Sequence, residues 1–369
     1  MRFAEILLSD IKMRENDFLR RGGVIDSIKS ASTTGIWGTG IAAQLVYTNL
    51  CRMGVKISFF ADNDKNRWNT KYNGIEVLSS NRVDKDSLII ICANVKYGIH
   101  EQLKRMGINN YIYIDPAYFY YTQASNAVQI IEQNADKIEH VCTMLKDDRS
   151  KCVYRNVLMH RAVYDLEAIW EVYDERQYFG NYIVNRVTGN FVDCGAFEGD
   201  TLCRFLKQIG NDEYRYFAFE ADTNNFVKLQ KYCTDNGLSK VSCYNLGVWN
   251  QKEELFFNIG ESIVSGTLIG ECTDYKKEKV MVDSIDNVMN GEKIDFISMD
   301  IEGSEIKALE GARKSIQKWK PTLAISAYHQ LEHLWEVPLL IKEIYGGYDI
   351  YFAHHCWNMD DTVCYAKER

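Results

Sequence analysis

The segment FVDCGAFEGDT, residues 191–201, constrains the fold of this chain more than any other feature. Its first residues have the apolar character of a buried strand. A glycine turn at Gly195 and Gly199 follows, and a helix start is predicted at Asp200. A strand, a glycine turn and a helix in this order are typical of ligand-binding loops in parallel α/β sheets. The segment therefore predicts an α/β unit with a site at the carboxyl end of its first strand.

The C-terminal half continues this alternation, which predicts a parallel sheet with helical crossovers. We expect its strands at 191–194, 215–220, 241–246, 295–299 and 322–328. The short alternating pattern between Gly247 and Asp283 predicts a hairpin excursion. The runs 348–355 and 362–366 are expected to pair antiparallel at the edge of the sheet.

The N-terminal half shows a smaller pattern of the same kind. After an amphipathic helix over roughly 2–20, strands are expected at 35–38, 56–61, 87–94 and 111–115, with a helix near 97–107. A chain of 369 residues is too long for one ordinary core. We therefore predict a Rossmann-like domain over 1–120, a helical connector over 121–180 and a second α/β domain over 181–369.

The first glycine loop, GTGIAA at 38–43, has no acid before Asp62. Its small residues would let a phosphate approach the helix N-terminus, and the later acid could bind ribose hydroxyls. Gly38, Gly40, Ala43 and Asp62 thus form a candidate nucleotide site. The alternative is a tight strand-to-helix turn without a ligand, because glycines serve that purpose too.

The second loop differs, because it carries Asp193, Glu198 and Asp200 and would repel a pyrophosphate. S-adenosylmethionine has a sulfonium, an ammonium and a ribose diol but no phosphate, so it suits an acid-lined loop. Glu220 ends the next predicted strand, where a carboxylate can accept both ribose hydroxyls. The sequence therefore predicts S-adenosylmethionine as the cofactor. We expect cofactor contacts from Asp193, Gly195, Ala196, Glu198, Gly199, Thr201, Glu220 and Ala221.

Four motifs in order carry a family resemblance. They are FVDCGAFEGDT, FEADTNNFVKL at 219–229, DFISMDIEGSEIKALEGA at 295–312 and PTLAISAYHQ at 321–330. Together they resemble the FkbM-type methyltransferase family over roughly 170–369. The resemblance implies the class I S-adenosylmethionine-dependent fold and O-methylation of hydroxyls on sugars and natural products. The loop DCGAFEG departs from the G-x-G-x-G common in that class.

Three residues are candidates for catalysis. Asp300 and Glu302 follow the strand 295–299, although acids also favour the first turn of a helix. His329 follows the strand 322–328 and should reach the same sheet edge as Asp300. An imidazole titrating near neutral pH could take the proton of an acceptor hydroxyl, with Asp300 orienting the ring. The alternative for His329 is a hydrogen bond to the backbone at a strand end.

The sequence also contains His329-Gln-Leu-Glu332-His333, which matches the inverted zincin motif. The motif directly follows a strand, and Pro338 is expected to end any helix early. We therefore predict no metal site. The 11 cysteines form no Cys-x-x-Cys pair, so neither a disulfide framework nor a zinc ribbon is indicated.

Composition narrows the class of protein. The net charge is -8 without a stripe of Lys or Arg, which argues against nucleic acid as a partner. No apolar segment approaches the length of a membrane span, so a cytoplasmic location is expected. The acid-lined loop predicts an S-adenosylmethionine-dependent methyltransferase, and the family resemblance implies that it O-methylates a hydroxyl of a sugar, a glycan precursor or a related small molecule. The alternatives are a nicotinamide- or nucleotide-sugar-dependent enzyme that uses the first loop, or a non-catalytic nucleotide-binding protein.

Overall fold

The computed structural model describes residues 2–20, 23–92, 98–114, 116, 119, 127–210, 213–259 and 276–369. The chain divides into two compact units. The first unit comprises Met1–Ala135, Asn156–Glu171 and Trp357–Met359, and the second unit comprises Asp136–Arg155, Val172–Cys356 and Asp360–Arg369. Parts of the predicted segments 87–94, 111–115, 121–180 and 247–283 lie outside the described residues. The domain boundaries predicted at 120 and 180 stay predictions.

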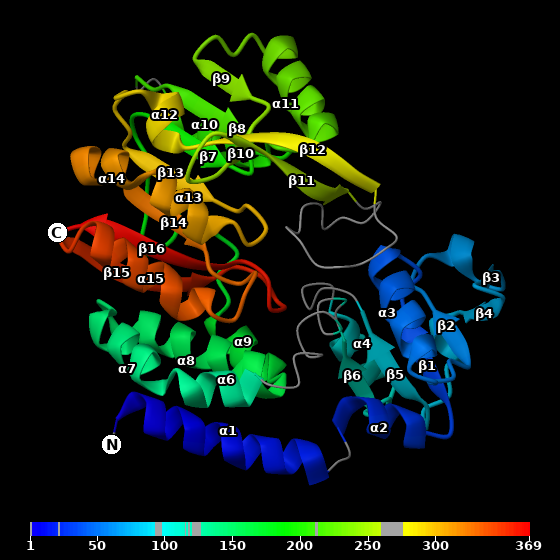
Figure 1. Cartoon of the computed structure of the whole chain (residues 1–369). Helices are drawn as coiled ribbons and strands as arrows, with labels where there is room; N and C mark the ends of the chain where they lie inside the picture. The colour runs from blue at the N-terminus through cyan, green and yellow to red at the C-terminus, as the bar shows by residue number, and fades with distance from the viewer. Residues whose placement is uncertain are drawn as a thin grey trace. The chain divides into compact units, whose positions relative to one another are not determined.

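The first unit is built around a six-stranded sheet in the order β3-β4-β2-β1-β5-β6 (Figure 1). Its strands are β1 Thr34–Trp37, β2 Phe59–Ala61, β3 Lys71–Tyr72, β4 Ile75–Leu78, β5 Leu88–Ile91 and β6 Tyr111–Tyr113. Its α-helices are α1 Phe3–Arg20, α2 Gly23–Ser30, α3 Ile41–Arg52, α4 Ile99–Arg105, α6 Ala127–Gln133 and α9 Leu166–Val172. All strand pairs are parallel except β3 with β4. The predicted parallel α/β unit is confirmed.

Two strands of the first unit were not predicted, and a local signal for them exists. β3 and β4 are joined by Asn73 and Gly74, both with positive φ (51° and 79°). An Asn-Gly pair between two short strands is a strong hairpin signal, because both residues adopt left-handed backbone conformations easily. The predicted strand 56–61 is also shorter in the structure, since β2 begins at Phe59.

The second unit contains a seven-stranded sheet in the order β15-β16-β14-β13-β7-β8-β9 (Figure 1). Its strands are β7 Phe191–Cys194, β8 Tyr216–Phe219, β9 Val241–Tyr244, β13 Phe296–Met299, β14 Thr322–Ser326, β15 Tyr348–His354 and β16 Thr362–Glu368. Only β16 runs antiparallel to its neighbours, β14 and β15. All five predicted parallel strands and the antiparallel pair are therefore confirmed. The chain has the predicted α/β class in both units.

A smaller sheet and the helices complete the second unit. The small sheet has the order β10-β12-β11, and β11 pairs antiparallel with β12, as the hairpin prediction requires. Its strands are β10 Gly247–Val248, β11 Glu253–Ile259 and β12 Lys276–Asp283. The helices are α7 Ala135–Met144, α8 Asp148–Val163, α10 Asp200–Ile209, α11 Thr223–Asp235, α12 Ile285–Met289, α13 Glu305–Gly311, α14 Arg313–Trp319 and α15 His333–Ile344. Helix α8 spans the boundary between the two units.

The expectation that Pro338 would end a helix is wrong. Helix α15 runs from His333 to Ile344 with Pro338 inside it. A proline removes one helical N–H donor and normally breaks a helix interior. Here Leu334, Trp335 and Ile341 are completely buried, and α15 packs against α13 and α14. Burial of an apolar face stabilises a helix more than local propensity does, so the helix continues.

The core of the second unit is aromatic. Phe191 of β7 stacks on Tyr216 of β8 and on Phe296 of β13, with ring centroids 4.9 and 4.8 Å apart. Phe205 of α10 covers the same ring at 5.3 Å. These contacts hold the three central strands in register, and their carboxyl ends consequently lie together at one edge. Among the described residues, no helix is long and apolar enough to cross a membrane.

Candidate functional site

A cavity of about 560 Å³ opens at the carboxyl ends of three neighbouring parallel strands of the second unit. Gly195 and Phe197 follow β7, Glu220 follows β8, and Asp300 and Glu302 follow β13. Ligands of open α/β sheets bind at this edge, because the loops after parallel strands meet there. The structure therefore brings together residues from three of the four sequence motifs.

The glycine at position 195 is needed for two of these strand ends to meet. Gly195 has φ +86°, and a Cβ atom there would lie 2.0 Å from the carbonyl oxygen of Asp300. The N–H of Asp300 donates a 3.0 Å hydrogen bond to the carbonyl of Cys194. Only a residue without a side chain allows this approach.

Glu220 lies where the sequence analysis expected it, at the end of the second strand and on the cavity wall. Its Oε2 accepts the N–H of Phe197 at 2.7 Å, and its Oε1 accepts the N–H of Asp222 at 2.8 Å. Burial raises the pKa of Glu220 to about 7, against the opposing effect of these two backbone donors. Each carboxylate oxygen has a second acceptor position, so Glu220 can still accept ligand hydroxyls.

Asp193 has a different environment, because it is 2% exposed and does not line the cavity. The hydroxyl of Tyr216 donates to its Oδ2 at 2.5 Å, and the hydroxyl of Ser298 donates to its Oδ1 at 2.8 Å. Burial raises the pKa of Asp193 to about 6, although both hydroxyls oppose this. Asp193 thus links β7 to β8 and β13 inside the sheet.

The other predicted cofactor contacts divide into two groups. Gly195, Thr201 and Ala221 line the cavity together with Glu220, whereas Ala196, Glu198 and Gly199 do not. Glu198 is an exposed residue whose Oε1 lies 2.7 Å from Nζ of Lys228. Sequence reasoning missed Tyr178, Asp222 and Asp361, which also line the cavity. No local motif marks Tyr178 or Asp361, because they come from loops far from the glycine turn in sequence.

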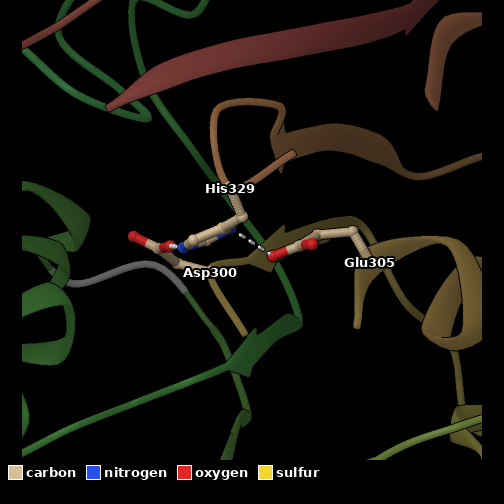
Figure 2. A group of neighbouring side chains, drawn as sticks. All are labelled: Asp300, Glu305 and His329. Atoms are coloured by element: carbon tan, nitrogen blue, oxygen red, sulfur yellow. Dashed lines mark ion pairs between the residues drawn. The ribbon is translucent and has the colours of Figure 1, made fainter. Parts of the chain in front are cut away.

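The candidate catalytic residues form one cluster around His329. Figure 2 draws Asp300 and His329 of this cluster together with Glu305. The imidazole Nε2 lies 3.4 Å from Oδ1 of Asp300 and 3.4 Å from Oε2 of Glu302. On the opposite side of the ring, Nδ1 lies 2.9 Å from Oε1 of Glu305. His333 Nδ1 lies 3.3 Å from the second oxygen, Oε2, of Glu305. The two histidines of the H-x-x-E-H motif thus meet at Glu305.

The charges in this cluster are strongly coupled. Burial disfavours the imidazolium of His329, but the charge of Glu305, followed by those of Asp300 and Glu302, raises its pKa to about 10. Burial alone would raise the pKa of Glu305, yet the neighbouring histidines lower it below its usual range. Burial raises the pKa of Glu302 to about 7 and also raises that of Asp300. His329 is therefore an imidazolium at neutral pH, where the sequence analysis expected a neutral base.

The glycine loop of the first unit is a separate candidate site. Helix α3 begins at Ile41, directly after Gly40. Gly40 has φ -85°, and a Cβ atom there would meet nothing within 4 Å. The hydroxyl of Thr39 donates to Oδ2 of Asp62 at 2.6 Å, and Oδ1 of Asp62 accepts the N–H of Asp64. Neither packing nor backbone conformation therefore requires a glycine at position 40.

Comparisons with known proteins agree with this architecture. Residues 193–351 match the family model described as the methyltransferase FkbM domain, and residues 32–114 match the one described as C2185-like, N-terminal. No curated protein sequence matches the chain. The crystal structure of methyltransferase FkbM from Methylobacillus flagellatus KT is 24% identical with a TM-score of 0.69, covering 98% of this chain and 100% of that chain.

More distant similarities extend to other methyltransferases. A putative rRNA-methylase from Clostridium thermocellum is 10% identical with a TM-score of 0.34, covering 50% of this chain and 89% of its own. At that TM-score the similarity does not bear on function. The family match spans the glycine loop, Glu220, Asp300 and His329 in one domain. The second unit therefore carries a methyltransferase domain of the FkbM family, an S-adenosylmethionine-dependent class of enzyme.

Proposed function

We propose that this protein transfers the methyl group of S-adenosylmethionine to a hydroxyl oxygen of a sugar, a glycan precursor or a related small molecule. The main observation that supports this proposal is that Asp300 and Glu302 line the same cavity as Glu220. A cofactor whose ribose is held at Glu220 would lie in this cavity with the catalytic candidates. We assign the acceptor hydroxyl to the carboxylates of Asp300 and Glu302.

The charge of the cavity supports this choice of ligands. Among the residues that the structure describes, the cavity wall includes no Lys or Arg. It includes six acids, namely Asp200, Glu220, Asp222, Asp300, Glu302 and Asp361. Such a wall favours a cationic cofactor and disfavours acceptors that are charged negatively near the reacting atom. A neutral hydroxyl fits, because it can donate a hydrogen bond to a carboxylate.

The proposed reaction is a direct displacement. The hydroxyl oxygen bonds to the methyl carbon in line with the sulfonium, the carbon–sulfur bond breaks, and its electron pair returns to sulfur as a neutral thioether. The hydroxyl proton passes to a carboxylate. Because His329 already holds its proton at neutral pH, we assign this role to Glu302, whose pKa near 7 suits a general base. The hydroxyl of Tyr328 donates a 2.9 Å hydrogen bond to Oδ1 of Asp300. We assign to Asp300 the positioning of the acceptor.

Calorimetry with S-adenosylhomocysteine tests the cofactor half of this proposal. Glu220→Ala should weaken binding by about 1.5 to 3 kcal/mol, the usual cost of losing hydrogen bonds to a charged group. Glu343→Gln is the control, because Glu343 is an exposed acid of α15 paired with Arg313. Unchanged affinity in Glu220→Ala would remove the ribose assignment.

Mass spectrometry after incubation with S-adenosylmethionine and a panel of neutral, amino and phosphorylated sugars tests the acceptor half. We expect O-methylation of an uncharged hydroxyl, and a fall in turnover of about 100- to 10,000-fold in Glu302→Gln. Cofactor affinity should stay unchanged in that variant. Methylation at nitrogen or carbon, or normal turnover of Glu302→Gln, would contradict the proposal.

A second proposal concerns the first unit, where a nucleotide or nucleotide-sugar would bind at the loop 38–43. It is supported by the open space beside Gly40 and by the absence of an acid in the first turn of α3. Ligands with phosphate, including NADH, should raise the melting temperature of the full-length protein, and Gly40→Val should abolish the shift without unfolding it. If no ligand raises the melting temperature of the wild type, the loop is a packing turn. A cytoplasmic location stays a prediction from sequence.

A further inference from the structure

We propose that Asp300, Glu302 and His329 bind a divalent metal ion at the acceptor end of the cavity, with Glu305 holding the imidazole in position. The sequence predicted no metal, because neither the H-x-x-E-H motif nor the cysteine spacing indicated a site. In the structure, Asp300, Glu305 and His329 each bring a ligand atom within 4.8 Å of the others, and Glu302 adjoins this group through Oε2, 3.4 Å from Nε2 of His329. Figure 2 shows the imidazole of His329 between the carboxylates of Asp300 and Glu305.

The Nε2 atom of His329 is the main observation. It is buried and forms no hydrogen bond among the described residues, although two carboxylate oxygens lie near it. The distances from Nε2 to Oδ1 of Asp300 and to Oε2 of Glu302 are both 3.4 Å. Nitrogen and oxygen ligands at about 2 Å from one ion lie roughly 3 to 4 Å apart, so these spacings suit a shared cation.

Glu305 gives the ring the orientation that metal-binding histidines have. Its side chain is completely buried, and its Oε1 lies 2.9 Å from Nδ1 of His329. The N–H groups of Ile301 and Gly303 donate to the same oxygen, and His333 contacts the other. A carboxylate on one ring nitrogen directs the opposite nitrogen toward a metal and makes it a stronger ligand. Here that opposite nitrogen is Nε2, between Asp300 and Glu302.

The balance of charge also favours a cation. Among the described residues, the basic groups within ion-pair distance of Asp300, Glu302 and Glu305 are histidines, with no Lys or Arg. Asp300 and Glu302 line the cavity, so open coordination positions would face the acceptor. Only the contact between the ion and an acceptor rests on the proposed O-methylation.

The ligand set indicates the kind of ion. Carboxylates suit Mg²⁺ and Mn²⁺, whereas imidazole suits Zn²⁺ and other transition metals. A mixed set is compatible with Mn²⁺, which also allows spectroscopic detection. Mn²⁺ is therefore the probe, and Zn²⁺ is a second arm of the same experiment.

The test uses the full-length protein after treatment with EDTA and dialysis. Titration with Mn²⁺, followed by EPR of the free ion, should show about one ion bound per chain. His329→Gln and Glu302→Gln should each weaken binding by at least about tenfold, as should Glu305→Gln through loss of ring orientation. The matched controls are His140→Gln on α7 and Glu343→Gln on α15, both exposed, which should bind like the wild type.

A second measurement needs no variant and so does not depend on their folding. In wild-type protein with ¹⁵N-labelled histidine, Mn²⁺ should broaden the ring signals of His329 and His333 before those of His140. The proposal is overturned if neither ion binds more tightly than about 1 mM, if His329→Gln binds like the wild type, or if broadening is not selective. Neither measurement uses an acceptor, so a negative result leaves the methyl transfer proposal to its own assay.

Discussion

Burial gives Glu220 and Asp193 different tasks, although both are acids at the ends of neighbouring strands. Glu220 reaches the cavity, and backbone N–H groups hold its two oxygens. Asp193 lies inside the sheet, and the hydroxyls of Tyr216 and Ser298 occupy its oxygens. The role of an acid at this sheet edge therefore depends on whether its carboxylate faces the cavity or the interior of the sheet.

Glu220 should make the stability of the ligand-free protein depend on pH. Its folded pKa of about 7 lies above the value of 4.5 for an unperturbed glutamate. The stabilisation that protonated Glu220 gives the folded state is fully present below about pH 4.5 and is lost as the pH rises through 7. The free energy of unfolding of the wild type should therefore fall by up to about 3 kcal/mol relative to that of Glu220→Gln over this pH range, since a shift of one pKa unit corresponds to about 1.4 kcal/mol. Urea unfolding at pH 4.5, 6 and 8 measures the difference, and a difference independent of pH would contradict the burial argument.

Asp193→Asn should affect folding rather than cofactor binding. The asparagine side chain cannot accept from both hydroxyls as the carboxylate does, so unfolding free energy should fall by about 1 to 3 kcal/mol. Affinity for S-adenosylhomocysteine should change less than about twofold, because Asp193 does not line the cavity. Urea unfolding and calorimetry on the same sample provide the check. Weaker cofactor binding with unchanged stability would restore Asp193 as a cofactor contact.

At the scale of the element, the strand-turn-helix unit that starts at Phe191 depends on backbone conformations that few residues adopt. Gly195 has φ +86° and Gly199 has φ +96°, and the exposed Phe197 between them also has positive φ. Glu302, in the loop after β13, shares this feature with φ 55°. Non-glycine residues with positive φ are uncommon and gather at functional sites, where surrounding contacts maintain the strain.

Gly195→Ala should be one of the most destabilising single changes in the second unit. The left-handed conformation costs an alanine about 1 to 2 kcal/mol, and the overlap with the carbonyl of Asp300 adds about 1 to 3 kcal/mol. Gly237→Ala is the control, since Gly237 has φ +61° but nothing within 4 Å of the added Cβ. Chemical denaturation should show the control losing only about 1 kcal/mol. Equal losses would mean that the close approach to Asp300 does not contribute.

At the scale of the whole molecule, each compact unit is built from segments that are distant in sequence. The N–H of Lys146 donates to the carbonyl of Ile350 at 2.9 Å, and Nζ of Lys146 lies 2.8 Å from Asp349. The ring of Tyr154 packs against Phe352 with centroids 5.1 Å apart. Residues in the predicted connector therefore cover β15, the edge strand of the large sheet.

A fragment of residues 181–369 should consequently be less stable than one of residues 136–369. Removing 136–180 uncovers β15 and the apolar surface under Tyr154, and an exposed edge strand promotes association. We expect a lower melting temperature and concentration-dependent aggregation for the shorter fragment. Circular dichroism and light scattering compare the two. Equal behaviour would instead favour the boundary predicted at 180.

Sequence alone determined the parallel strands of the second unit, the order of its α/β elements and the choice of cofactor, because these follow from local patterns such as FVDCGAFEGDT. It also indicated that Asp300 and His329 meet, since parallel strands end at one edge. Only the tertiary structure brought Glu305 and His333 to His329, gave the imidazole a pKa of about 10 and turned Asp193 into the sheet. Those outcomes depend on burial and on charges contributed by residues distant in sequence, which no spacing within one segment encodes.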